Sequence, residues 1–460
     1  MIERSDCEPS ERQNMALPPH RHPPTPTGNP LWGNWQQYTQ NPLEFLQNSA
    51  QRYGDVFRLR FAFLSSYLFT HPDVSHEILA KQAQAFEKDP ITHRSLGRII
   101  HQGLTVNEGE PWKRQRRLMQ PAFHVSRINT YVQMMVQYTA QMLASWREDE
   151  IVDINQELIA LTLRIVAQAL FGTDVMESAS QVSKSMALLE ESFTKESLSL
   201  PIPYWLPTPH NLAVNRVLQS LDILVRRIIA EHRSTGKDTG DLLSMLLLAQ
   251  DEDGSQMSDQ QLHDEVLTLL LGGHETTANA LVWACYLLSQ HPEVAQKLRD
   301  EVDTVLGQRA PTLEDLPRLQ YVDMVIKETL RVYPPAWILG RQAMQDVELG
   351  GYQVRKGTMV FVSPYVQHHD PRWFEEPEAF YPERFSEENE KKIRAHAYIP
   401  FGAGPRACIG SRFTLTEQKV VLTLLAQKCK LNLPPNQKVE MEPLITIRPK
   451  GGMSMIISKR

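Results

Sequence analysis

Cysteine is scarce in this chain of 460 residues, which has four: Cys7, Cys285, Cys408 and Cys429. So few cysteines exclude a disulfide-stapled scaffold and favour a reducing compartment. The sequence has no run of about 18 apolar residues, which a membrane-spanning helix needs, and its N-terminus holds no apolar core of signal-peptide length. We therefore expect a soluble, cytoplasmic protein without a transmembrane segment, and peripheral membrane contact stays open.

Positive charge is not in excess either. The net charge of −6 excludes a global basic field for nucleic acid. Several catalytic motifs are also absent: the GxxxxGK[ST] phosphate loop, the HExxH zinc helix, paired CxxC motifs and the GxSxG serine elbow. Hydrophobic residues make up 42% of the chain and charged residues 22%, so a large buried core is expected.

Apolar residues at three- and four-residue spacing dominate the middle of the chain and predict a mainly α fold with small β-sheets. Strand-like alternation occurs at 55–70 and 347–362, and residues 439–458 predict a closing hairpin around Gly451-Gly452. The segment 363–407 is loop-like. Residues 1–23 are predicted to form a flexible tail and 24–460 a single domain, because no linker divides the rest. The predicted helices lie near 128–148, 153–172, 211–233, 241–250, 258–290, 292–306, 320–333 and 410–428.

The most specific motif surrounds Cys408, in the segment from Phe401 to Gly410 (FGAGPRACIG). The glycines let the backbone approach something large and flat. Backbone amides and the N-terminus of the helix that follows would stabilise a thiolate at Cys408, and Arg406 adds a cation that could pair with an anionic group. These features suit a metal-bound sulfur, and the alternative is a small apolar cysteine in a turn.

The predicted helix 258–290 is apolar almost all round, which indicates a buried central helix. Gly272 and Gly273 lie in its middle, where each costs about 1 kcal/mol relative to alanine. Either another helix packs closely there, or a planar ligand needs the room. Glu275 and Thr276 follow in an apolar stretch, where buried polar groups need partners. Thr276 could also bond back to its own helix.

Charged residues recur at helical spacing elsewhere. Glu328 and Arg331 share one helix face, and Pro382-Glu383-Arg384-Phe385 follows them in the chain. Trp112 and Arg116, four residues apart, project from one face of a basic helix.

Taken together, these motifs resemble those of the cytochromes P450, the haem-thiolate monooxygenases. The matches are FxxGxRxCxG at 401–410, [AG]Gx[DE]T[TS] at 272–277, ExxR at 328–331, PERF at 382–385 and WxxxR at 112–116. The resemblance covers residues 24–460 and implies the single-domain fold of that family, with haem b between the long central helix and the cysteine loop.

The resemblance also implies a role for each motif residue. Cys408 would be the axial thiolate of the haem iron, Glu275 and Thr276 would relay protons during dioxygen activation, and a network of Glu328, Arg331 and Arg384 would support the haem loop. The other expected haem contacts are Trp112, Arg116, Gly272, Arg341, Phe401, Arg406 and Gly410. The expected substrate pocket includes the loop near Phe86–Leu104 and Thr268, Leu271, Ala336, Trp337, Ile338 and Ile445, with core packing as the alternative for each.

The resemblance implies that one oxygen atom of O2 enters a small apolar substrate by hydroxylation or epoxidation, with fatty acids and terpenoids favoured. Only 52 residues follow Cys408 (460 − 408), too few for a flavin domain. Electrons from NAD(P)H would therefore arrive through a separate ferredoxin, or flavodoxin, and its reductase. Two rival functions are a peroxide-using haem-thiolate enzyme, against which the Glu275-Thr276 pair argues, and a non-catalytic haem sensor.

A possible docking surface for the electron carrier is basic. The cations that could form it are Lys113, Arg114, Arg117, Lys391, Lys392, Arg394 and Arg412. A solvated charged face is the alternative.

Overall fold

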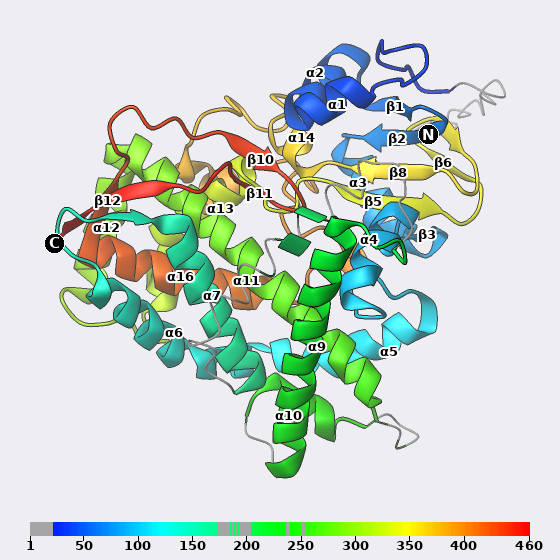
Figure 1. Ribbon diagram of the computed structural model, residues 1–460. Helices are drawn as coiled ribbons and strands as arrows, with labels where there is room; N and C mark the ends of the chain where they lie inside the picture. The colour runs from blue at the N-terminus through cyan, green and yellow to red at the C-terminus, as the bar shows by residue number, and fades with distance from the viewer. Residues whose placement is uncertain are drawn as a thin grey trace, which may run out of the picture.

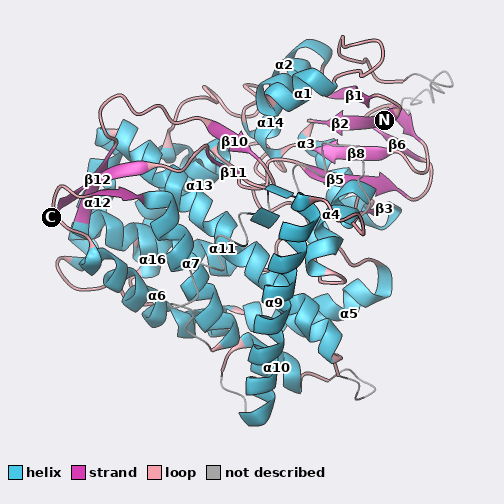
Figure 2. Cartoon of the chain, in the orientation of Figure 1, coloured by secondary structure: helices cyan, strands magenta, loops and turns pink. Residues whose placement is uncertain are grey.

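Helices make up most of the fold, and small sheets lie beside them, as the sequence predicts (Figure 1, Figure 2). The computed structural model describes residues 22–172, 204–235, 240–250, 254 and 256–460, and between 172 and 204 only residues 185, 188, 189, 191 and 192. In both views the largest sheet forms one corner, beside α1 (Trp35–Gln40) and α2 (Pro42–Tyr53), and helices make up most of the rest, with a few strands near the C-terminus. Most of the predicted tail lies outside the described residues.

The central element is α11 (Asp259–Gln290), which runs through the helical part of the molecule (Figure 1). It begins with a capping box, because the Ser258 hydroxyl accepts the Gln261 N–H and the Gln261 side chain accepts the Ser258 N–H. It ends at His291, where Pro292 starts the next helix. The helices packed along it include α7 (Ile154–Phe171), α9 (Pro209–Thr235), α13 (Gln320–Val332) and α16 (Ser411–Lys428).

The predicted helices are confirmed to within a few residues. The segment 363–407 was predicted as loop, but it also contains four short helical turns. The other helices are α3 (Pro72–His76), α4 (Pro90–Ile100), α5 (Gly109–Met119), α6 (Val125–Ser145), α10 (Leu242–Leu248), α12 (Pro292–Leu306), α14 (Pro364–His368) and α15 (Glu387–Glu390). The 3-10 and π turns are η1 (Glu77–Lys81), η2 (Ala83–Ala85), η3 (Gln120–Phe123), η4 (Leu316–Arg318), η5 (Pro382–Phe385) and η6 (Gly404–Arg406).

The largest sheet has the strand order β1-β2-β8-β5-β3. Residues 55–70, where strand-like alternation was predicted, form a hairpin at its edge. Strand β2 pairs in parallel with β8, whereas the other neighbours are antiparallel. A second hairpin, in the predicted strand-like segment 347–362, turns at Gly350-Gly351. The strands involved are β1 (Val56–Phe61), β2 (Leu64–Phe69), β3 (Phe86–Glu87), β5 (Leu339–Ala343), β6 (Val347–Leu349), β7 (Tyr352–Val354) and β8 (Met359–Val362).

The C-terminal hairpin differs from the prediction. It turns at residues 444–446, between β10 (Met441–Pro443) and β11 (Ile447–Pro449), and not at Gly451-Gly452. Both glycines have positive φ, and they send the chain into a different sheet. There β12 (Ser454–Lys459) pairs with β4 (Ile151–Asp153) and β9 (Cys429–Asn432). Pairing between strands far apart in sequence has no local signal.

Among the described residues, α7 is long and apolar enough to cross a membrane by length and composition. Buried residues make up 61% of it, and it packs along α11 in the core. Core helices of soluble proteins pass the same test.

Candidate active site

The loop that carries Cys408 is shaped by its own packing. It lies between η6 and α16, and the Cys408 N–H donates to the Phe401 carbonyl at 3.0 Å. Gly404 has φ +69°, and a Cβ there would collide with the backbone of Leu79 and Ala80 in η1. Contact with the protein's own backbone therefore requires a glycine at position 404.

The Cys408 thiol presents an exposed surface although protein atoms crowd around it, so it faces open space within the fold. Burial raises the pKa of this thiol, and the backbone N–H groups of Gly410 and Ser411 and the Arg116 guanidinium oppose that rise. Two amides at the start of α16 and one cation thus surround the sulfur. These contacts favour a thiolate but do not outweigh burial, so a charged sulfur here also needs a bound cation such as a metal ion.

The two glycines of α11 serve different purposes. A Cβ on Gly273 would lie 3.1 Å from the Val166 side chain of α7, so this glycine permits close helix packing. A Cβ on Gly272 would meet nothing within 4 Å, and Gly272 is exposed on a helix that is otherwise mostly buried. Close helix packing, the first interpretation of the glycine pair, therefore holds for Gly273 and not for Gly272. Gly272 leaves an open surface at the centre of the molecule.

Glu275 and Thr276 follow this open surface but do not bond to each other. The buried Glu275 carboxylate accepts from the Thr446 hydroxyl at 2.6 Å and from the Asn279 amide at 3.2 Å. Thr446 belongs to the turn between β10 and β11. The half-buried Thr276 hydroxyl donates to the Gly272 carbonyl at 2.9 Å, which is the back-bond considered as an alternative above.

A direct contact ties α11 to the helix that follows the cysteine loop. The hydroxyl of Thr277, on α11, hydrogen-bonds that of Thr414 in the first turn of α16. Because Cys408 lies just before this turn and Thr276 lies just before Thr277, the contact brings the loop next to the Gly272–Thr276 segment. The cysteine and the open helix surface are thus parts of one site.

Cations collect near the cysteine loop. The Arg406 guanidinium stacks 3.9 Å from the centre of the Trp112 ring and pairs with Glu108. The Arg116 Nη1 donates to the Ala407 carbonyl, next to Cys408, at 2.9 Å. The structure therefore brings Trp112, Arg116 and Arg406 together around the loop.

Two further cations adjoin this group. Arg341 is buried, and its Nη1 donates to its neighbour's carbonyl, that of Gly340, at 2.8 Å. Burial, with Arg341 and Arg406 nearby, lowers the pKa of Lys88 to about 7, against the opposing effect of Glu108 and Asp89. Lys88 lies inside the pocket segment expected from the sequence, but sequence analysis did not identify it as a site residue. A single lysine has no pattern that would reveal it.

Glu328 and Arg331 of α13 form a buried charged network with Arg384. The Arg331 guanidinium binds both oxygens of Glu328 at 2.8 Å, and the two side chains are fully buried. Arg384 reaches the same carboxylate at 3.4 Å. The remaining Arg331 N–H groups donate to three backbone carbonyls, those of His368, Pro377 and Ala379. The structure brings these three charged residues together and ties them to the segment that precedes the cysteine loop.

The expected pocket residues divide into two groups. Trp337 is buried in the cluster around Leu43, Phe57 and Trp283, and its indole N–H donates to the Leu444 carbonyl at 2.9 Å, so core packing accounts for it. Thr268 is also buried and bonds back to the Asp264 carbonyl. The residues that keep some exposure are Leu271, Ala336, Ile338 and Ile445.

These features fit haem. The Cys408 sulfur can bind an iron ion, and the open surface at Gly272 leaves room for a flat ring. Two propionates can pair with nearby cations, which are Arg116, Arg341, Arg406 and Lys88. The fold and the site define the class of haem-thiolate oxidoreductases.

The comparisons with known proteins identify the family. The cytochrome P450 family model matches residues 23–455. Cyclooctatin synthase of Streptomyces melanosporofaciens is 36% identical, and the match covers 97% of this chain and 98% of that protein. Cyclooctat-9-en-7-ol 5-monooxygenase of the same organism is 35% identical, over 95% of each chain. Pentalenene oxygenase of Streptomyces avermitilis is 33% identical, over 92% of this chain and 94% of that protein.

The chain belongs to the cytochrome P450 family, as the motifs predicted. It is an oxidoreductase of the monooxygenase class, and its family carries haem and uses O2.

Proposed function

We propose that this enzyme oxidises a terpenoid by inserting one oxygen atom of O2 and releasing the other as water. The observation that carries the proposal is the near full-length similarity to three oxygenases whose names specify cyclooctatin, cyclooctat-9-en-7-ol and pentalenene. Partly exposed apolar side chains near the site, including Leu271 and Ile445, suit such a substrate. This support favours terpenoids over fatty acids, the other class that the sequence suggested.

Bound haem would supply the redox chemistry that activates dioxygen, and the side chains around it would hold and tune it. Cys408 would supply the thiolate that holds the iron, and the amides of Gly410 and Ser411 would favour its charged form. Arg116, Arg341, Arg406 and Trp112 would hold the propionates, with Lys88 as an additional cation. Phe401 and Gly410 would border the sulfur, since a Cβ on Gly410 would lie 4.0 Å from it.

The acid and the alcohol have distinct tasks in this proposal. The Thr276 hydroxyl donates its hydrogen bond to the Gly272 carbonyl. The lone pairs of its oxygen therefore stay available to accept a hydrogen bond from a water or an oxygen species in the open space. Glu275 is held by Thr446 and Asn279 and would accept and return protons only after one of these bonds shifts. Thr276 therefore orients a proton donor, and Glu275 connects it to the proton supply.

Thr276→Ala is expected to uncouple electron use from product formation. The variant removes the acceptor that orients the donor, so reducing equivalents are lost to peroxide or water; we expect the ratio of product to NAD(P)H consumed to fall by roughly 10-fold or more. Thr276→Ser, which keeps the hydroxyl, is the matched control and should retain most of the coupling. An unchanged ratio in Thr276→Ala would remove Thr276 from the mechanism.

We propose that a ferredoxin, or a flavodoxin, docks at the basic hollow beside the cysteine loop. This hollow, about 990 Å³, is lined by Lys113, Arg116, Arg117 and Arg127 together with Gly404 and Pro405. Among the other cations suggested for the docking surface, Lys391 pairs with Glu387, Lys392 with Glu388 and Arg394 with Asp73. The cysteine content favours a reducing cytoplasm, where such carriers work.

Charge reversal tests this docking site. We expect Lys113→Glu with Arg117→Glu to slow reduction by ferredoxin roughly 10-fold or more at low salt, because steering of an acidic carrier is lost. High salt should reduce the difference between the reduction rates of the variant and the parent enzyme, since it screens exposed charges. Lys450→Glu, on the turn after β11, is the control. A reduction rate that depends on neither salt nor this reversal would exclude the site.

Optical titration of the ferric holoenzyme tests the substrate class. We expect cyclic terpene hydrocarbons and alcohols to produce a saturable shift of the haem band to the high-spin form, because a ligand that fills the pocket expels water. Fatty acids of equal carbon number serve as matched controls, which share hydrophobicity but not shape. A saturable shift with fatty acids and none with terpenoids would replace the proposed substrate class.

A further inference from the structure

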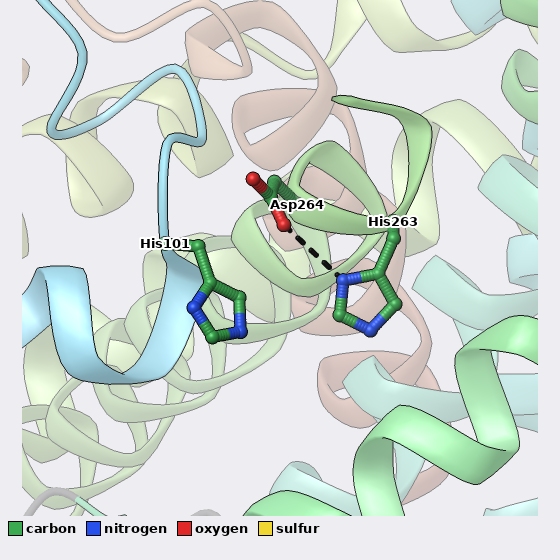
Figure 3. A group of neighbouring side chains, drawn as sticks. All are labelled: His101, His263 and Asp264. Atoms are coloured by element: carbon green, nitrogen blue, oxygen red, sulfur yellow. Dashed lines mark hydrogen bonds and ion pairs between the residues drawn. The ribbon is translucent and has the colours of Figure 1, made fainter. Parts of the chain in front are cut away.

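Two histidines and an aspartate lie together away from the cysteine loop. His101 follows the last turn of α4, and His263 and Asp264 belong to the first turns of α11 (Figure 3). One potential ligand atom from each residue lies within 4.8 Å of the others. His263 and Asp264 are buried, whereas His101 is exposed, so the cluster is open to solvent on one side. None of these residues serves the proposed oxidation.

The geometry of the buried pair suits a tetrahedral metal. The His263 Nδ1 lies 3.2 Å from the Asp264 Oδ1. Ligands at about 2.1 Å from a tetrahedral zinc ion lie roughly 3.4 Å from one another. The pair therefore already has close to the spacing that one metal ion would require. Figure 3 shows the His101 ring on the open side of the same space, with a ring nitrogen on the edge facing His263.

The far side of His263 is arranged as in known zinc sites. Its Nε2 lies 2.9 Å from the Asp222 Oδ1 of α9, although this contact is not aligned as a hydrogen bond. A carboxylate behind a ligating imidazole orients the ring and strengthens it as a ligand. Metal binding through Nδ1 would fix the proton on Nε2, where Asp222 can accept it.

Local charge also favours a cation. Asp264 is buried on α11, and Asp222 of α9, which pairs with Arg226, contacts His263. Among the described residues, the donors to the Asp264 carboxylate besides His263 are neutral: the Gln260 amide at 2.7 Å and the Gln102 N–H at 3.1 Å. Buried carboxylates without a cation are costly, and a divalent ion would offset that cost.

His101 holds an unusual backbone conformation that aims it at the cluster. Its φ is +46°, a region that residues other than glycine rarely adopt. The next residues are anchored on α11, because the Gln102 and Leu104 N–H groups donate to Asp264 and Glu265. Gly103 packs against Thr268 so tightly that a Cβ would collide with the hydroxyl. A metal ion here would fasten this loop to the central helix.

We propose that His101, His263 and Asp264 bind one divalent transition-metal ion of the zinc type, which clips the loop after α4 to α11. Two imidazoles and a carboxylate form a ligand set typical of zinc, with water as the fourth ligand. Mg²⁺ should not bind, because it requires more oxygen ligands in octahedral geometry. The site is distinct from the haem and does not depend on the identity of the substrate.

Equilibrium dialysis of the holoenzyme against Zn²⁺, with elemental analysis of zinc per haem iron, tests the proposal. We expect one zinc ion per iron, and a dissociation constant at least roughly 10-fold higher in His101→Asn, since a ligand is lost. Asparagine tolerates positive φ, so the loop should keep its conformation. His93→Asn, an exposed histidine on α4, is the matched control and should leave binding unchanged.

A second variant and a second measurement separate this site from adventitious binding. Asp222→Asn keeps all three ligands but weakens the support of His263, and we expect it to raise the dissociation constant by about 10-fold or more. Zinc should also slow amide hydrogen exchange at Gln102 and Leu104 in the parent enzyme only. Zinc binding that is equal in the parent and His101→Asn, or no stoichiometric binding, would overturn the proposal.

Discussion

Cys408→Ser is expected to abolish monooxygenase turnover, with a fall of at least about a thousandfold, on the order of 4 kcal/mol in activation free energy. The serine oxygen cannot supply the electron density that a thiolate gives to the iron, and this density favours cleavage of the O–O bond. The measurement is product formation, together with the absorption spectrum of the reduced protein under carbon monoxide. The red-shifted Soret band, which is typical of a thiolate ligand, should disappear.

Cys429→Ser provides the matched control. Cys429 is buried at the end of α16, and its thiol donates to the Leu425 carbonyl at 3.4 Å, a bond that a serine hydroxyl can keep. We expect this variant to retain both the band and the activity. If the red-shifted band survived in Cys408→Ser, another residue would have to be the ligand and our assignment would be wrong.

Arg331→Ala is expected to cost about 3–5 kcal/mol of unfolding free energy. The substitution leaves the Glu328 carboxylate buried without its bidentate partner. It also removes the Arg331 hydrogen bonds to the backbone carbonyls of His368, Pro377 and Ala379. Since these carbonyls hold the segment before the cysteine loop, the haem content should fall together with stability. Urea unfolding and the ratio of haem to protein measure the two effects.

An exposed ion pair supplies the comparison. Lys391 and Glu387 are four residues apart on the surface, and both are mostly exposed. Lys391→Ala should therefore change the unfolding free energy by less than about 0.5 kcal/mol. Arg331→Lys keeps the charge but loses the forked geometry, so its loss of unfolding free energy should lie between those of Arg331→Ala and Lys391→Ala. Equal stabilities for Arg331→Ala and Lys391→Ala would contradict the structural role of the buried network.

Much of the site could be predicted because its signals are local. The glycine pair within α11 and the Glu328–Arg331 spacing each act over one or two helical turns. The Cys408 segment likewise combines its glycines and its thiol in ten residues. Such patterns report local backbone geometry directly, so the structure brings these residues close to where the motifs placed them.

Features that depend on distant contacts could not be predicted. Gly273 faces Val166 from another helix, and Gly404 faces the backbone of Leu79. Trp337 follows the ExxR helix as a pocket residue would, but partners distant in the chain enclose it in the core. The C-terminal hairpin was misplaced for the same reason, because the pairing of β12 with β4 and β9 leaves no mark near Gly451-Gly452.

The His101–His263–Asp264 cluster is likewise invisible in the sequence. His101 and His263 are 162 positions apart in the sequence (263 − 101), and no short motif connects them. They meet because two backbone N–H groups of the loop after α4 bind carboxylates of α11. Tertiary anchoring, and not local pattern, creates this candidate site.

Turnover under isotopically labelled dioxygen tests the central claim most directly. The holoenzyme, with ferredoxin, reductase and NAD(P)H, is incubated with the terpenoid that gives the strongest high-spin shift, and the product is analysed by mass spectrometry. We predict a product with exactly one labelled oxygen atom, formed only when the electron supply is complete. A product that takes its oxygen from water, or one that forms with peroxide but never with dioxygen and reductant, would contradict the proposed monooxygenation.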